Sequence, residues 1–133
     1  MTPTPNHLID SSVLIPYIRK HQGIVTRLNA LANKYVSPTI VAELAFGAWR
    51  SSDPKTGMTR VTDALAPFST LEIDEDVGFQ FALMKNFLVT RNLLIPESDI
   101  WIASTAVVYG AILIARDAHF SRLAAYGLQF QPW

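Results

Sequence analysis

The sequence contains no cysteine among its 133 residues. A disulfide framework, a thiolate nucleophile and a cysteine-ligated metal site are therefore excluded, and the chain is compatible with a reducing compartment. The chain also lacks an uninterrupted apolar run of the ~20 residues that a membrane-spanning helix needs. Its first residues, MTPTPNH, do not join a basic stretch to an apolar one. We therefore expect no signal peptide, no membrane contact and a cytoplasmic location.

Neither sign of charge is in excess, because 11 basic residues balance 11 acidic residues. The net charge does not show the excess of basic residues that is typical of nucleic-acid-binding proteins. A basic surface for binding a nucleic acid would therefore require an uneven distribution of the charges. Disorder is excluded as well, since 50% of the residues are hydrophobic and 17% are charged. We predict a single domain over residues 1–133, in which the proline-rich residues 1–6 are loose.

The most informative stretch is residues 94–120, which begins with a helix pattern. Ser98 is placed to cap the first turn of this helix, and Asp99 lies in that turn. Gly110 ends the helix, as a residue free to take a positive φ would. An acid therefore stands at the start of a helix with one apolar side.

Two further acids follow apolar segments that are typical of buried strands. Asp117 comes two residues after the run 111–115, and Asp10 directly follows His7–Ile9. In a parallel sheet the carboxyl ends of the strands meet at one rim, where ligands gather near a reversal of strand order. We expect Asp10, Asp99 and Asp117 to face that rim.

Hydrophobic periodicity and turn residues predict short strands that alternate with helices along the chain. The expected strands end at Asp10 or cover residues 35–37, 68–73, 111–115 and 128–130. The expected helices begin near Ser12 or cover residues 23–33, 39–52, 58–66, 74–92, 98–109 and 118–125. A serine is expected to cap the first helix, with Pro16 in its first turn. The helix over 74–92 is expected to bury Phe79, Ala82, Leu83, Asn86 and Phe87. The alternation predicts an α/β sandwich with a mostly parallel sheet.

Glu43 is the fourth acid in an unusual setting, because it lies inside the apolar helix pattern TIVAELAFGA. A charged residue there needs a partner or a purpose. Carboxylates that converge repel one another unless a cation neutralises them. A ligand set of oxygens alone favours Mg²⁺ or Mn²⁺ over zinc, and such ions support phosphodiester chemistry.

The chain resembles PIN-domain ribonucleases, and more narrowly the VapC-type toxins of prokaryotic toxin–antitoxin pairs. Four segments carry this resemblance in the family's order and spacing: HLIDSSVLI, TIVAELAFGA, PESDIWIASTAV and ILIARDAHF. The resemblance covers the chain from about His7 to Trp133. It implies a PIN-like three-layer sandwich, with a short, mostly parallel sheet flanked by helices.

Site residues also follow from the resemblance. It implies an acidic pocket that holds Mg²⁺ or Mn²⁺ and is formed by Asp10, Glu43, Asp99 and Asp117. Ser12 would assist by hydrogen-bonding the metal, its water or a carboxylate, and Arg116 would contact a carboxylate or a phosphate. The chain departs from the family at Ala115, where a threonine is common, so position 115 offers no hydroxyl to the site.

The implied activity is metal-assisted hydrolysis of structured RNA, such as tRNA or ribosomal RNA, at single-stranded loops. The resemblance also implies a homodimer and a small cognate antitoxin that covers the site.

Simpler explanations exist for each acid alone. Asp10 is suited to cap a helix, Asp99 to favour a helix dipole and Asp117 to shape a turn. His119 is assigned to packing, with a role as a general acid as the weaker option. The alternative functions are a PIN-like nuclease in RNA processing, a degenerate PIN fold that only binds a protein, and a metal-dependent phosphatase or phospho-receiver.

Overall fold

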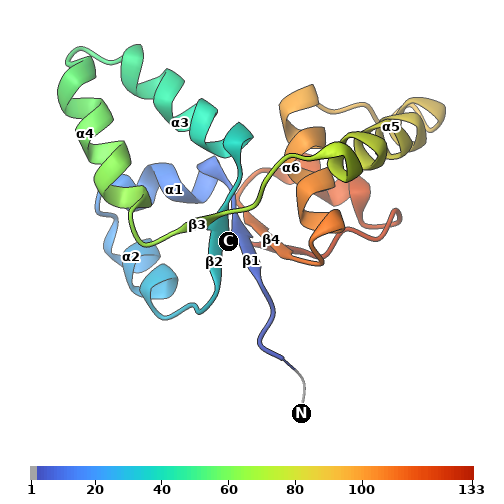
Figure 1. The fold of residues 1–133 in the computed structure, drawn as a ribbon, viewed down its shortest axis with the longest axis horizontal. Helices are drawn as coiled ribbons and strands as arrows, with labels where there is room; N and C mark the ends of the chain where they lie inside the picture. Colours follow the sequence, from blue (N-terminus) through green and yellow to red (C-terminus); the bar gives the residue numbers. More distant parts are fainter. Residues whose placement is uncertain (1–2) are drawn as a thin grey trace.

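A five-stranded parallel sheet forms the centre of the computed structural model, which describes residues 3–133 (Figure 1). Its strands in spatial order are β3 (Ser69–Thr70), β2 (Lys34–Val36), β1 (His7–Ile9), β4 (Ile112–Ala115) and β5 (Phe130–Pro132). All four neighbouring pairs are parallel, and Leu8 stands opposite both Tyr35 and Leu113. The prediction of a mostly parallel sheet is confirmed.

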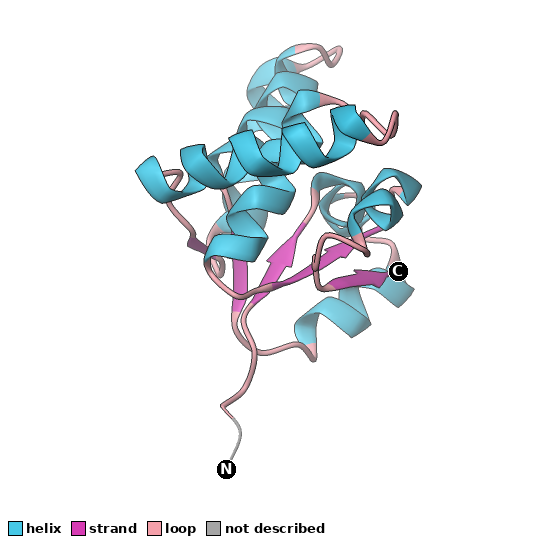
Figure 2. Cartoon of the chain, turned by 90° about the vertical axis from the view of Figure 1, so that its right-hand side faces the viewer, coloured by secondary structure: helices cyan, strands magenta, loops and turns pink. Residues whose placement is uncertain are grey.

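Helices cover both faces of this sheet and complete the three-layer sandwich (Figure 2). One layer holds α1 (Ser11–Ile18), α2 (Gln22–Asn29), α3 (Pro38–Trp49) and α4 (Pro54–Leu65). The other holds α5 (Glu75–Thr90), α6 (Glu97–Val108) and the short 3₁₀ helix η1 (Ala118–Leu123). In Figure 1 the first group lies to the left of the central strands and α5 and α6 lie to the right. Within residues 3–133, no helix combines the length and the apolar character required to cross a bilayer.

The two central strands supply the middle of the core. Leu8, Ile9, Leu113, Ile114 and Ala115 are fully buried. Burial of one such aliphatic side chain typically stabilises the fold by about 1.5–3 kcal/mol. Because β1 and β4 are almost entirely apolar on both faces, they are most stable in the centre of the sheet, where helices cover both sides. As expected, Gly110 ends α6 with a φ of +62°, and the chain turns there into β4.

Several predicted helix starts were wrong. Asp10, rather than a serine, caps α1, and its carboxylate accepts the Ser12 amide hydrogen. This cap starts the helix at Ser11 and places Pro16 in the helix interior, where the sequence had suggested the first turn. Ser98 makes no capping hydrogen bond, because α6 starts earlier and the Pro96 carbonyl accepts the first amide hydrogens.

Other boundaries also differ from the predictions. Asp53 caps α4, so that helix begins four residues before its predicted start. Helix α2 ends at Asn29, short of the predicted Asn33, and β3 is reduced to two residues. Strand β5 pairs two residues later than predicted. The expectation that residues 1–6 are loose lies partly outside the described residues, since 1–2 are not described; residues 3–6 have no helix or strand.

The buried side of α5 was also predicted wrongly. Phe79 and Leu83 are 65% and 63% exposed, and Ala82 and Asn86 are exposed as well. Of the predicted residues, only Phe87 is partly buried and packs against the core, and the fully buried residues of the helix are Val77, Met84 and Leu88. Both stripes have helical spacing, and the choice between them follows from packing on α6, where Phe81 stacks on Trp101 with ring centroids 4.1 Å apart.

Candidate active site at the rim of the sheet

The site lies where the strand order of the sheet reverses. The chain begins at the central strand β1, builds β2 and β3 on one side, and returns as β4 on the other side of β1. Asp10 leaves β1 at this point, and Asp117 follows β4 after one intervening residue. Parallel α/β sheets form their ligand crevice at such a reversal, because the neighbouring connections diverge to opposite faces.

Ser12 ties the exits of the two central strands together. Its hydroxyl donates to Oδ2 of Asp10 at 2.6 Å and accepts the backbone N–H of Arg116 at 2.8 Å. The same Asp10 oxygen accepts the Ser12 amide at 3.1 Å. Asp10 is 4% exposed, so these bonds hold a nearly buried carboxylate in one orientation. The expected contact between Ser12 and a carboxylate is present.

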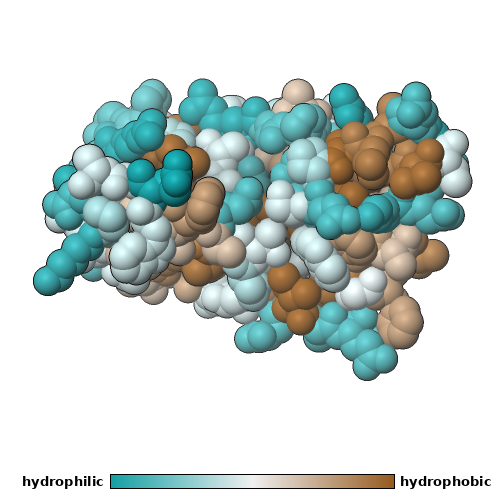
Figure 3. Space-filling model, turned by 90° about the horizontal axis from the view of Figure 1, so that it is seen from above, coloured by the Kyte–Doolittle hydropathy of each residue, from teal (hydrophilic) through white to brown (hydrophobic). Residues whose placement is uncertain are grey.

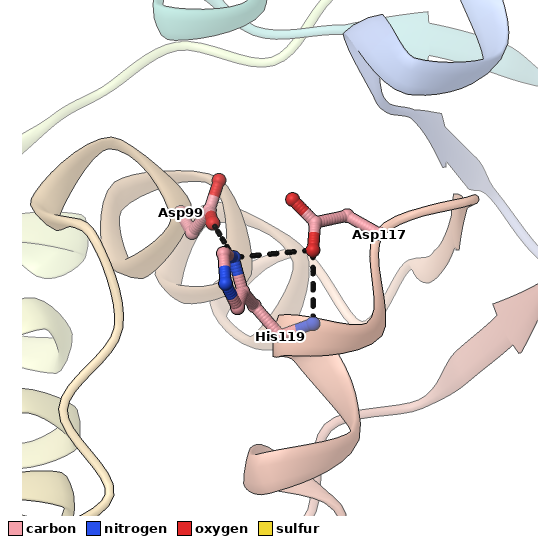
Figure 4. A group of neighbouring side chains, drawn as sticks. All are labelled: Asp99, Asp117 and His119. Atoms are coloured by element: carbon pink, nitrogen blue, oxygen red, sulfur yellow. Dashed lines mark hydrogen bonds and ion pairs between the residues drawn. The ribbon is translucent and has the colours of Figure 1, made fainter.

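Asp99 and Asp117 face each other across the ring of His119 (Figure 4). Nδ1 of His119 lies 3.2 Å from Oδ2 of Asp99 and 3.1 Å from Oδ1 of Asp117. Asp99 sits in the first turn of α6 and is 7% exposed. Asp117 caps η1, and its Oδ1 accepts the backbone N–H of His119 at 2.9 Å.

Glu43 approaches the same place from α3, in the opposite helical layer. Its Oε1 lies 3.4 Å from the hydroxyl oxygen of Ser11, which donates to it. The charges of Asp10, Asp99 and Asp117 all act on Glu43 and raise its pKa. The structure therefore brings Asp10, Glu43, Asp99 and Asp117, hereafter the acidic cluster, to one rim from four separate segments.

Burial and crowding favour the protonated forms of Asp10, Glu43 and Asp99. Burial, followed by the charges of Asp10 and Asp99, raises the pKa of Glu43 from an ordinary 4.5 to about 7. Burial also raises the pKa of Asp10, and the charge of Asp117 adds to this while hydrogen bonds from Ser12 oppose it. The pKa of Asp99 is raised by burial and by its acidic neighbours, against the hydrogen bond with His119. A cation at this rim would favour the ionised forms and offset both the burial and the repulsion that raise these pKa values.

The donor set fits a divalent cation. Asp99, Asp117 and His119 each offer one ligand atom, and these atoms all lie within 4.8 Å of one another. Asp10 and Glu43 lie outside this tightest group but supply further negative charge. Carboxylate oxygens suit Mg²⁺ and Mn²⁺, and an imidazole nitrogen suits first-row transition ions.

Two residues differ from the sequence expectations in instructive ways. The sequence predicts a packing role for His119, yet its ring lies between two acids. The only feature of the sequence that indicates a place in the site is its position two residues after Asp117. The side chain of Arg116 is exposed, and only its backbone N–H bonds within the site, to Ser12. Ala115 is fully buried beneath the rim.

Comparison with known proteins agrees with this architecture. The family model described as "PIN domain" matches residues 7–126. Ribonuclease VapC2 of Haemophilus influenzae is 31% identical over 130 residues, covering 96% of this chain and 97% of that protein. Ribonuclease VapC1 of Methanocaldococcus jannaschii is 30% identical over 123 residues, covering 92% and 84%.

Solved structures share the fold over almost the whole chain. VapBC2 from Rickettsia felis, crystallised with a promoter DNA fragment, superposes with a TM-score of 0.88 at 21% identity and covers 96% of this chain and 98% of that chain. Other structures of the same fold include a toxin–antitoxin complex from Klebsiella pneumoniae. Because the PIN match spans most of the sequence and the VapC relatives cover nearly all of it, this chain belongs to the PIN-domain family and, within it, to the VapC ribonucleases.

Proposed function

We propose that the acidic cluster is the hydrolytic site of a Mg²⁺- or Mn²⁺-dependent endoribonuclease toxin of the VapC type. The observation that carries the proposal is the convergence of four carboxylates at the reversal of strand order, in a chain that belongs to the VapC ribonucleases. Burial and the charges of neighbouring acids raise the pKa values of Asp10, Glu43 and Asp99, so a bound cation would relieve the unfavourable crowding of negative charge in this site.

The residues of the acidic cluster have different roles in binding the ion, which follow from their positions. Asp99 and Asp117 offer ligand atoms within 4.8 Å of each other and hold the ion, while Asp10 and Glu43 complete the negative pocket around it. When bound, a divalent ion supplies a water of lowered pKa and neutralises charge on a phosphoryl oxygen. Ser12 keeps the Asp10 carboxylate in place through its two hydrogen bonds to that group.

The substrate is structured RNA, such as tRNA or ribosomal RNA, cut in a single-stranded loop. Arg19 and Arg60 line a groove of about 480 Å³ that begins at Glu43. Arg19 and Arg116 also line a shallower hollow beside Ser12. These guanidinium groups provide phosphate contacts next to the acids, even though the whole chain has no net charge.

The proposed antitoxin covers the site by lying in the same groove, between α1, α3 and α4. Ile15, Leu44 and Val61 form apolar walls there, and Glu43 stands at the acidic end. A segment with apolar side chains and one basic side chain would match this pattern of walls and charge. The VapBC2 structure from Rickettsia felis and the toxin–antitoxin complex from Klebsiella pneumoniae, which share this fold, support such a partner.

A homodimer is proposed from the exposed face of α5. Phe79 and Leu83 are one turn apart on this helix and are mostly exposed. Seen from above, apolar surface gathers over the α5 side of the molecule, at the right of Figure 3. Association of two copies would remove this apolar area from water.

We also propose that residues 1–133 act as one domain in the cytoplasm. A single hydrophobic core joins residues from both helical layers to the sheet, which supports the first point. The second follows from the substrate class, because tRNA and ribosomal RNA are cytoplasmic molecules.

The test is cleavage of 5′-labelled RNA by the chain purified free of antitoxin, with Mg²⁺, Mn²⁺ or EDTA. We expect cleavage only with a metal ion, and a loss of at least a hundredfold in Asp99→Asn, which preserves size while removing charge. The matched control is Asp63→Asn, an exposed acid on α4 outside the cluster. Unchanged cleavage by a folded Asp99→Asn variant would refute the site. A folded parent that cuts no RNA with either ion would favour the protein-binding alternative.

A further inference from the structure

We propose that His119 is a nitrogen ligand of the cation in this site, together with Asp99 and Asp117, and that it tunes the site toward first-row transition ions over Mg²⁺. This inference rests on the proposed function only in taking the acidic cluster as a cation site. The residue differs from the acids in chemistry, because a ring nitrogen adds one softer donor to a set of hard oxygens.

The separations of the ligand atoms match a coordination sphere. Adjacent ligands at right angles, each about 2.1 Å from an ion, are about 3.0 Å apart. Nδ1 of His119 lies 3.2 Å from the Asp99 oxygen and 3.1 Å from the Asp117 oxygen. The nitrogen could therefore occupy a corner next to each of the two oxygens, and the ligand atoms of the three residues all lie within 4.8 Å of one another.

The backbone holds the ring at this position. Asp117 caps η1 and accepts the N–H of His119, which fixes the start of the 3₁₀ turn and the direction in which the His119 side chain leaves it. The ring therefore enters the gap between the two acids from the same short turn that carries Asp117, as Figure 4 shows. The His119 side chain remains 42% exposed, so an ion and its waters have access from solvent.

Nδ1 of His119 faces two carboxylate oxygens, but it carries at most one hydrogen to donate. A single Nδ1–H cannot be directed well at both acceptors at once. A cation bound by all three groups satisfies both oxygens and the nitrogen together. This nitrogen distinguishes ions, because imidazole affinity rises along Mn²⁺, Co²⁺ and Ni²⁺, whereas Mg²⁺ prefers oxygen.

Calorimetric titration of the full chain with Co²⁺ and with Mg²⁺ tests the assignment. We expect His119→Ala to weaken Co²⁺ binding by about tenfold or more, and Mg²⁺ binding by less than about threefold. His21→Ala is the matched control, since His21 is exposed and makes no side-chain capping bond, and it should leave both affinities unchanged. Circular dichroism verifies that each variant is folded.

A second readout observes the nitrogen directly. Pulsed EPR of Mn²⁺ bound to the parent should show a ¹⁴N coupling that His119→Ala removes. Equal Co²⁺ affinities of parent and His119→Ala, or no nitrogen coupling, would overturn the inference. A higher affinity in His119→Ala would also overturn it, because the ring would then compete with the ion for its position.

These failures differ from failure of the proposed function. If the parent binds metal and cuts RNA while His119→Ala binds Co²⁺ equally well, only the role of His119 is wrong. If the folded parent binds neither ion and cuts no RNA, the metal-dependent nuclease and this inference fail together.

Discussion

The metal-free chain should lose stability as the pH rises, and Glu43 should cause much of that loss. The folded state raises the pKa of Glu43 from 4.5 to about 7. Between these values the folded chain binds more protons than the unfolded chain, so unfolding becomes easier as the pH increases. The loss nears completion about one pH unit above the folded pKa, near pH 8, and then stays constant.

The magnitude follows from the shift in pKa. A rise from 4.5 to about 7 corresponds to about 3 kcal/mol against the folded state at high pH. Glu43 is partly exposed, so solvent screening reduces this figure, and we take half of it, about 1.5 kcal/mol. Glu43→Gln removes the ionised group and should raise the unfolding temperature at pH 8 by roughly 5 °C, with a much smaller effect at pH 4.5.

The assay is thermal unfolding in EDTA at pH 4.5 and pH 8, followed by circular dichroism. Glu72→Gln serves as the control, because this exposed carboxylate lies outside the acidic cluster. Adding Mn²⁺ at pH 8 should stabilise the parent more than Glu43→Gln, since the variant lacks one carboxylate of the pocket. Equal unfolding temperatures of parent and Glu43→Gln at pH 8 in EDTA would refute the claim that Glu43 is electrostatically strained.

Three other perturbations test separate parts of the architecture. Ser12→Ala removes the hydroxyl that joins the exits of β1 and β4, and should lower the free energy of unfolding in urea by about 1–2 kcal/mol. Gly110→Ala should cost about 1–2 kcal/mol because its φ is +62°, whereas Gly47→Ala, in open space on α3, should stabilise by up to about 1 kcal/mol. Equal effects of the two glycine substitutions would contradict the backbone argument. Phe79→Ser combined with Leu83→Ser should shift the mass in light scattering from dimer to monomer without loss of helical signal; an unchanged dimer mass would exclude this face of α5 as the interface.

Patterns close together in the sequence predicted the fold well. Strands β1 and β4 were recognisable because both of their faces are buried, which leaves a short apolar run in the sequence. Gly110 marked its turn because few other residues accept a positive φ. An acid one or two residues after such a strand lies near the carboxyl rim of a parallel sheet, so the places of Asp10 and Asp117 also followed from the sequence.

Contacts between distant residues were decided only by the tertiary structure. The buried stripe of α5 depended on the surface of α6, and the sequence offered two stripes with equal spacing. Asp10 both caps helix α1 and belongs to the acidic cluster. The sequence around Asp10 is compatible with either role and does not show that both apply. His119 lies beside Asp99 although 20 positions separate them. Periodicity records which residues are buried or turn the chain, whereas the electrostatics of the site depend on distances across the sheet rim, and those distances exist only once the two helical layers pack around β1 and β4.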